Sequence, residues 1–225
     1  MKIDWDTVQG FPPTFFHRRD DFEDDHFYRV PRLVTHIDDE AIRRVGRLYS
    51  RLGIDGDVLD LMSSWISHFE TAPRRLIGLG MNRAEMAQNA AMKDFVVHDL
   101  NQDPLLPFPD ESIDHVVCCV SVDYLTRPLM VFGDIARILR PGGLFVHTFS
   151  NRCFPTKAIH GWLMTSDEDH MGIVSAYFRL SGAFHPAHAE TLTPDDHRGD
   201  PLFGVWAQKL SGLASGRPRS TKTTR

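Results

Sequence analysis

Short apolar runs alternate with segments of helical periodicity between residues 38 and 150, and this alternation constrains the fold more than any other feature. Apolar side chains recur at helical spacing from Ile42 to Leu52, and Gly53 ends that segment. The same region predicts strands over residues 57–61, 75–79, 95–97, 113–120 and 144–149, and further helices over 83–91 and 128–139. Strands that alternate with helices predict a mostly parallel sheet with right-handed crossovers and helices on both faces.

The pattern changes after Asn151. Residues 167–180 predict a helix, and residues 183–192 and 201–209 predict an antiparallel hairpin at the end of the sheet. The first 37 residues hold aromatic and charged side chains with little periodicity, which is typical of a wrapping or lid segment. We therefore expect a wrapping segment over 1–37, one α/β domain over 38–210 and a disordered basic tail over 211–225.

The charge balance argues against nucleic acid as a partner, and the lengths of the apolar runs argue against a membrane. The 225 residues include 25 Lys and Arg against 30 Asp and Glu, and four of the basic residues lie in the last fifteen positions, so residues 1–210 carry a formal charge of −9. A large basic surface for nucleic acid is therefore not expected. The longest apolar run, from Val116 to Val120, is too short to cross a bilayer.

Cysteine usage and the N-terminal sequence predict a cytoplasmic protein. Three cysteines, two of them adjacent, cannot form a disulfide framework and suit a reducing compartment. The first ten residues hold acids where an export signal needs an apolar run. Among twelve histidines, the spacing of His185 and His188 lacks an accompanying Cys-x-x-Cys or His-Glu-x-x-His pattern, so we expect no metal site. No sequence feature specifies an oligomeric state.

Ligands bind beyond the carboxyl ends of the strands in an open α/β sheet, so the blocks that follow the predicted strands carry the chemistry. These blocks are VLDLMSSW at 58–65, GLGMN at 78–82, HDLN at 98–101, SVDYLTRP at 121–128 and TFSNRCFPTKA at 148–158. Together with the RPGG turn at 140–143, their order resembles class I S-adenosylmethionine (SAM) methyltransferases, and more narrowly a group of bacterial and plant proteins related to methyltransferase type 11.

The resemblance covers residues 27 to 209 and implies a fold, a cofactor and a reaction. The implied fold is the Rossmann-like methyltransferase fold, with a mostly parallel seven-stranded sheet, helices on both faces and a C-terminal antiparallel hairpin. The implied cofactor is SAM, and the implied reaction is methyl transfer to a small molecule.

The implied cofactor site keeps one usual contact of the superfamily and alters two. Asp99 matches the acid that accepts the adenine amino group. Residues 62–65 replace the glycine-rich loop without a single glycine, and Asn82 replaces the acid that binds the ribose hydroxyls, with Glu85 one turn further on. The expected cofactor-binding residues are Asp60, Met62, Ser63, Ser64, Trp65, Gly80, Met81, Asn82, Asp99, Leu100 and Ser121.

The acceptor site is expected beside the cofactor site. A sulfonium methyl is already activated, so the protein must mainly align a nucleophile and exclude water. The resemblance places residues 121–124 where superfamily members line the methyl-transfer site, so Asp123 or Tyr124 is expected to act as a catalytic group that orients the acceptor. The segment 27–32 and His36 are expected to close over the cleft. Arg152 and Lys157 favour a small anionic acceptor, because both bind carboxylate or phosphate well. The expected acceptor-binding residues are Tyr28, Arg32, Asn151, Arg152 and Lys157.

The altered loop also suits a second interpretation, a non-catalytic descendant that senses the cofactor or binds another protein. A cavity beside Asp99 and Asn82 favours the enzyme, whereas a space filled by Met62 and Trp65 favours the non-catalytic protein. A third interpretation is a different nucleotide-derived ligand in the same crevice, because a fold does not fix a function.

Overall fold

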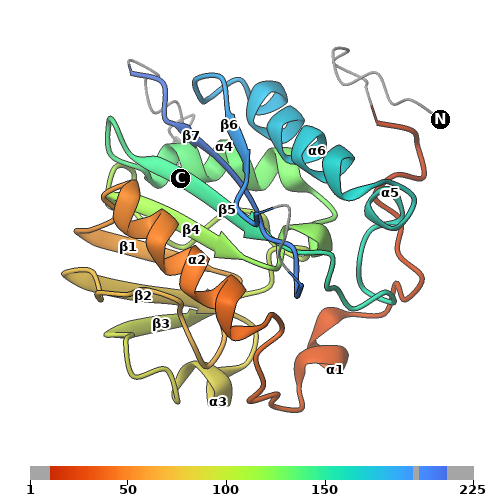
Figure 1. The fold of residues 1–225 in the computed structure, drawn as a ribbon, viewed down its shortest axis with the longest axis horizontal. Coiled ribbons are helices and arrows are strands. Elements are labelled where there is room, and N and C mark those ends of the chain that lie inside the picture. Colours follow the sequence, from red (N-terminus) through yellow and green to blue (C-terminus); the bar gives the residue numbers. More distant parts are fainter. Residues whose placement is uncertain (1–10, 195–197, 212–225) are drawn as a thin grey trace, which may run out of the picture.

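A seven-stranded sheet forms the centre of the computed structural model, which describes residues 11–194 and 198–211 (Figure 1). The strands are β1 (Asp57–Leu61), β2 (Arg75–Gly80), β3 (Asp94–Val97), β4 (His115–Cys119), β5 (Leu144–Phe149), β6 (His188–Thr191) and β7 (Phe203–Gln208). Their order is β3-β2-β1-β4-β5-β7-β6, in which β1 to β5 pair in parallel and β7 is antiparallel to both β5 and β6. The predicted fold class, including the C-terminal hairpin, is confirmed.

Local signals place the helices. They are α1 (Asp24–Tyr28), α2 (Asp39–Arg51), α3 (Arg83–Met86), α4 (Pro128–Ile138), α5 (His160–Leu163) and α6 (Asp167–Ser181). The Asp38 carboxylate caps α2 by accepting from Ala41 N, and a capping box of Ser166 and Asp169 begins α6. Gly182 ends α6 in the left-handed conformation at φ +67°. None of the described helices is long and apolar enough to span a bilayer.

The predicted helix over residues 83–91 is wrong beyond Met86. The Asn89 side chain accepts from Ala91 N and donates to Ser64 O and Ser67 Oγ. Asn side chains often compete with helix formation by bonding to nearby backbone groups. Here the bonds of Asn89 satisfy Ala91 N and its own side chain without a continued helix. The shortened helix α3 lies directly beyond the end of β2, and Asn89 ties the segment after it to the loop that follows β1.

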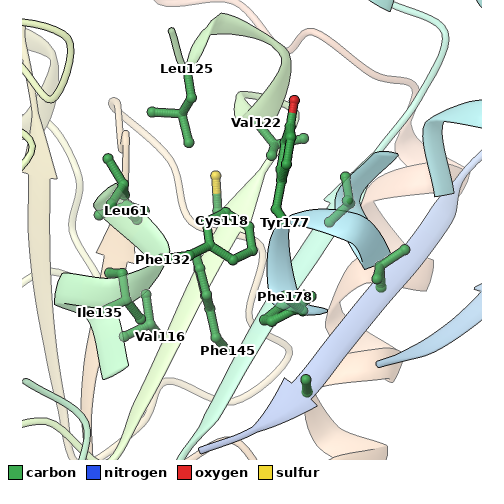
Figure 2. Close-up of a cluster of buried hydrophobic side chains, with 14 of the residues drawn as sticks. Leu61, Val116, Cys118, Val122, Leu125, Phe132, Ile135, Phe145, Tyr177 and Phe178 are labelled. Atoms are coloured by element: carbon green, nitrogen blue, oxygen red, sulfur yellow. The ribbon is translucent and has the colours of Figure 1, made fainter. Parts of the chain in front are cut away.

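Buried apolar side chains cover both faces of the sheet. This explains why the sequences of the strands are nearly continuous apolar runs. Helix α2 covers one face, and α4 and α6 cover the other (Figure 1). Figure 2 shows the core beneath α4 and α6, where Phe132 packs against Phe145 at 4.9 Å and Phe178 at 4.8 Å between ring centroids. Two buried faces hold the sheet rigid, so the loops at its carboxyl edge start from fixed positions.

The segment before α2 is anchored at both ends. We call residues 11–38 the strap. Phe15 is buried in the core beneath α4 and α6, Arg18 forms an isolated bridge with Ile159, and Asp38 begins α2. Between these anchors the strap includes α1 and crosses the carboxyl edge of the sheet (Figure 1). The tail expected over 211–225 lies, except for Ser211, outside the described residues.

Candidate functional site

A cavity of about 570 Å³ opens at the carboxyl ends of β1 to β4, where an open α/β sheet binds its ligands. This volume falls within the range of small-molecule sites, about 300–1,000 Å³. The predicted site residues that line it are Tyr28, Arg32, Met62, Ser63, Ser64, Gly80, Met81, Asn82, Asp99, Leu100, Ser121, Tyr124 and Arg152. The structure thus brings blocks that are far apart in the sequence to one place.

Several lining residues escaped the sequence reasoning. They are Asp24, Thr35, Ile37, Asp38, Leu79, His98, Asn101, Val120, Phe154 and Asp200. Four of them stand inside the blocks that carry the family resemblance, so a signal for them existed: Leu79, His98, Asn101 and Phe154. The strap residues and Asp200 had no such signal, because they belong to segments without periodicity whose course is set by tertiary contacts.

The loop after β1 adopts the backbone conformation that a glycine would take. Met62 has φ +56°, and Val120, on the opposite wall after β4, has φ +47°. Side chains other than glycine rarely adopt this region, and the cost is about 1–2 kcal/mol per residue. Strained residues of this kind cluster at binding and catalytic sites. The loop after β1 therefore holds Met62 in a conformation that usually calls for glycine.

The loop hydroxyls bind carboxylates of the protein. Ser63 Oγ donates to Asp60 at 2.5 Å, Ser67 Oγ donates to the same carboxylate at 2.5 Å, and Ser64 Oγ donates to Glu85 at 2.6 Å. Burial raises the pKa of Asp60 to about 6, and the two serine hydroxyls oppose that shift. Asp60 lines a smaller cavity of about 70 Å³ on the other side of the loop. Its carboxylate anchors the loop through the two serine hydroxyls.

Asn82 and Glu85 hold the strap across the cavity. The Asn82 side chain caps α3 by accepting from Ala84 N and Glu85 N, and it donates to Tyr28 O at 2.8 Å. Glu85 accepts from Arg32 N at 2.6 Å with the oxygen that Ser64 does not use. Trp65, which lines only the smaller cavity, donates to a strap carbonyl as well. The turn after β2 is therefore a clamp for the strap.

Gly80 is where β2 passes closest to the loop after β1, and a substitution here tests that contact. A Cβ at Gly80 would lie 2.2 Å from Ser63 O. Gly80→Ala is expected to cost about 1–3 kcal/mol of stability in urea denaturation, because a backbone oxygen must move. Gly133→Ala, in α4 with nothing within 4 Å of the added Cβ, is the control and should be neutral or stabilising by up to about 1 kcal/mol. Equal effects of the two substitutions would contradict the close contact.

Asp99 forms the end wall of the cavity beyond β3. Its Oδ1 accepts from Asn101 N at 2.8 Å and Gln102 N at 3.3 Å, which fixes the side chain in a turn. Among the described residues nothing donates to its other oxygen. Leu100 follows and is buried. Asp99 thus lines the cavity and keeps one carboxylate oxygen without a donor from the described part of the chain.

The two expected catalytic groups are separated in the structure. Tyr124 lines the cavity, its hydroxyl accepts from Phe154 N at 2.8 Å, and its ring stacks on Phe154 at 5.9 Å between centroids. Asp123 is 2% exposed and is absent from the cavity lining, so it does not face the acceptor as predicted. Burial raises the pKa of Asp123 to about 8.

The basic side chains expected at the cleft mouth lie in different environments. Arg152 lines the cavity, and its Nε donates to Asp200 at 2.6 Å. Lys157 is placed incorrectly by the prediction: its side chain is 0% exposed and pairs with Asp20 and Asp24, each at 3.1 Å. Asn151 lies with Arg152 on an adjoining open recess rather than on the main cavity. Lys157 therefore supports the strap and does not reach a ligand.

Comparison with known proteins agrees with this geometry. Residues 65–147 match the family model described as a methyltransferase domain. The chain is 25% identical over 129 residues to the methyltransferase GfsG of Streptomyces halstedii, which is 52% of this chain and 46% of that protein. It is 36% identical over 69 residues to the fatty-acid O-methyltransferase of Mycolicibacterium smegmatis, which is 31% of this chain and 24% of that protein. The matches thus span less than half the length of both curated relatives.

Solved structures extend the likeness to most of the fold. A SAM-dependent methyltransferase from Archaeoglobus fulgidus superposes with a TM-score of 0.53 at 14% sequence identity, covering 75% of this chain and 94% of that chain. The chain therefore has the same fold as this SAM-dependent methyltransferase. Together with the family-model match over residues 65–147, this shared fold agrees with the resemblance predicted from the sequence blocks.

Proposed function

We propose that this protein binds SAM in the main cavity and transfers its methyl group to a small molecule. The observation that carries the proposal is the open cavity beside Asp99 and Asn82, at the strand ends of a methyltransferase fold. Met62 forms part of its wall without filling it, and Trp65 lies outside it. The non-catalytic interpretation expected both side chains to fill that space.

The residues present fit the cofactor. The free oxygen of Asp99 suits the adenine amino group, with Leu100 beside it, because a carboxylate accepts an N–H bond strongly. Glu85 holds two protein donors and keeps lone pairs for a ribose hydroxyl. Met62 and Ser121 would face the amino-acid end. When bound, SAM supplies an activated methyl group, and the protein's part is to align the acceptor and exclude water.

The acceptor end of the proposed site lies between Tyr124 and the strap. Tyr28, Tyr124 and Arg152 line this part of the cavity, and its walls come from α1, the segment after β4 and the loop after β5. The relatives favour a small-molecule acceptor, since one of them is named a fatty-acid O-methyltransferase. The acidic body of the chain favours the same class over nucleic acid. Three free cysteines support a cytoplasmic location.

Isothermal titration with S-adenosylhomocysteine tests cofactor binding. We expect binding to the native chain and a loss of about tenfold in affinity for Asp99→Asn, since one charge-assisted hydrogen bond contributes about 1.5–3 kcal/mol. The substituted amide keeps the oxygen that closes the turn. Asp103→Asn is the matched control, because Asp103 caps a neighbouring turn through Leu105 N and does not line the cavity. No heat with SAM or S-adenosylhomocysteine at millimolar concentration would refute the proposal.

The non-catalytic interpretation remains the second candidate, and one observation favours it. The side chains of Ser63, Ser64 and Asn82 all form hydrogen bonds to other groups of the protein. A module that senses the cofactor without catalysing a reaction would tolerate this arrangement. Binding of S-adenosylhomocysteine without methyl transfer to any acceptor would select this candidate. Transfer of a radiolabelled methyl group from SAM to a small molecule would select the enzyme.

A further inference from the structure

The cavity wall holds five carboxylates, and the protein already engages all of them. Each one accepts at least two hydrogen bonds from other groups of the chain. They are Asp24, Asp38, Glu85, Asp99 and Asp200. The acidic groups of the wall therefore do not call for a cationic methyl acceptor, although they outnumber the arginines that line it.

Arg32 stands in the opposite situation. Its guanidinium donates to the backbone carbonyls of Phe27 at 2.9 Å and Val30 at 3.4 Å. Within the described part of the chain, no carboxylate lies within 4.0 Å of its guanidinium nitrogens, whereas the other lining arginine, Arg152, is paired with Asp200. A guanidinium has five donors in a planar fork that fits a carboxylate. Arg32 thus offers the cavity an unpaired positive charge.

Flat rings surround that charge. The Arg32 guanidinium lies 4.5 Å from the centroid of the Phe27 ring and 5.5 Å from that of Phe154. Phe154 stacks on Tyr124 with an interplanar angle of 29°, and the His36 ring meets it edge-on at 5.2 Å. Such a wall favours a planar ligand over a chain or a saturated ring, because offset-stacked and edge-to-face contacts are both available.

Two phenol hydroxyls have hydrogen-bonding capacity to spare on the same wall. The Tyr28 hydroxyl is buried and has no partner among the described residues. The Tyr124 hydroxyl accepts from Phe154 N, so its own proton is available to donate. A buried hydroxyl without a partner costs free energy, and a polar group of a ligand would remove that cost.

From these observations we propose that the methyl acceptor is a planar aromatic carboxylic acid. Arg32 binds its carboxylate, its ring lies against Phe154, and Tyr28 and Tyr124 orient its hydroxyl or amine. The oxygen or nitrogen forms a bond to the methyl carbon as the methyl–sulfur bond of SAM breaks. S-adenosylhomocysteine is the leaving group, and the proton of the acceptor is released to solvent. This inference rests on the proposed function and names its substrate class. Arg32 is accordingly a specificity-determining residue on the strap.

Three probes test the charge and the ring separately: 4-hydroxycinnamate, its methyl ester and cyclohexanecarboxylate, titrated with and without S-adenosylhomocysteine. We expect 4-hydroxycinnamate to bind at least tenfold more tightly than either comparison compound, and Arg32→Gln to abolish that preference over the ester. Arg83→Gln is the matched control, because Arg83 also lies over a phenylalanine, Phe95 at 5.5 Å, but outside the cavity. Equal binding of the three probes, or no effect of Arg32→Gln, would overturn the inference.

The methionine part of SAM also carries a carboxylate, so a second arm separates the two sources. S-adenosylhomocysteine contains this carboxylate and 5′-methylthioadenosine lacks it. If Arg32 binds the acceptor, Arg32→Gln leaves the affinity ratio of the two nucleosides unchanged. A loss confined to S-adenosylhomocysteine assigns Arg32 to the cofactor and overturns the inference. If neither nucleoside binds to the native chain, the proposed function is refuted. The probe titrations without nucleoside then still show whether Arg32 binds the carboxylate of an aromatic acid.

Discussion

Asp24→Asn is expected to destabilise the protein by about 3–5 kcal/mol at neutral pH, which is the usual cost of removing one partner from a buried ion pair. The Asp24 carboxylate is 3% exposed. It accepts hydrogen bonds from Arg18 Nη1 and Asn101 Nδ2, each at 2.8 Å, and forms a salt bridge with Lys157 Nζ at 3.1 Å. The amide leaves the fully buried Lys157 ammonium with one ionic partner, Asp20, and two backbone carbonyls. Urea denaturation at pH 7 measures the loss.

The pH dependence gives a second readout of the same residue. Burial opposes ionisation of Asp24, but the hydrogen bonds from Arg18, Asn101 and Lys157 outweigh it, so its pKa lies below the ordinary value of 3.8. A lowered folded pKa means that the stabilisation is complete above the unfolded pKa and is lost as the pH falls through the folded pKa. The gap between native and variant proteins should therefore close in acid.

Two substitutions calibrate this result. Asp21→Asn, at an exposed neighbouring position, should change stability by no more than about 0.5 kcal/mol. Lys157→Met removes the buried ammonium and leaves Asp24 with Arg18 and Asn101, so we expect a smaller loss than for Asp24→Asn. A loss below about 1 kcal/mol for Asp24→Asn would show that the strap does not depend on this carboxylate.

The sequence could predict the sheet because its signal is local. Most residues of 57–61 and 113–120 are apolar because the sheet is covered on both faces, and Gly53 and the RPGG turn mark the ends of helices. The same local patterns located the strand ends, and thereby Met62, Asp99 and Tyr124 on the cavity wall. Topology rules then sufficed to bring these blocks together.

Side-chain partners could not be predicted in the same way, because they depend on segments distant in the chain. Glu85 accepts from Arg32, 53 residues away, and Lys157 donates to the carbonyl of Phe22, 135 residues away. Neither partner has a periodic pattern. A lysine and an arginine five positions apart, Lys157 and Arg152, look equivalent in sequence, yet one is buried in an ion-pair network and the other lies at the cavity wall. Only tertiary structure distinguishes them.

Asp123→Asn is expected to stabilise the protein at alkaline pH, in contrast to Asp24→Asn. Asp123 is 2% exposed, its Oδ2 has no partner among the described residues, and burial raises its pKa from 3.8 to about 8. Between these two pH values the unfolded chain has released a proton that the native state still holds. Stability therefore falls as the pH rises from about 4 to about 8, by on the order of 5 kcal/mol if the full shift is realised.

The amide of Asp123→Asn keeps the size of the side chain and does not titrate. Urea denaturation of both proteins at pH 5, 7 and 9 should give a difference that grows in favour of the variant with rising pH. Asp60, whose pKa is also raised, titrates in both proteins and cancels from the difference. Asp103→Asn, at an exposed turn, should show no such trend. A difference independent of pH would mean that Asp123 is ionised in the native state, and hence that water reaches the wall behind Tyr124.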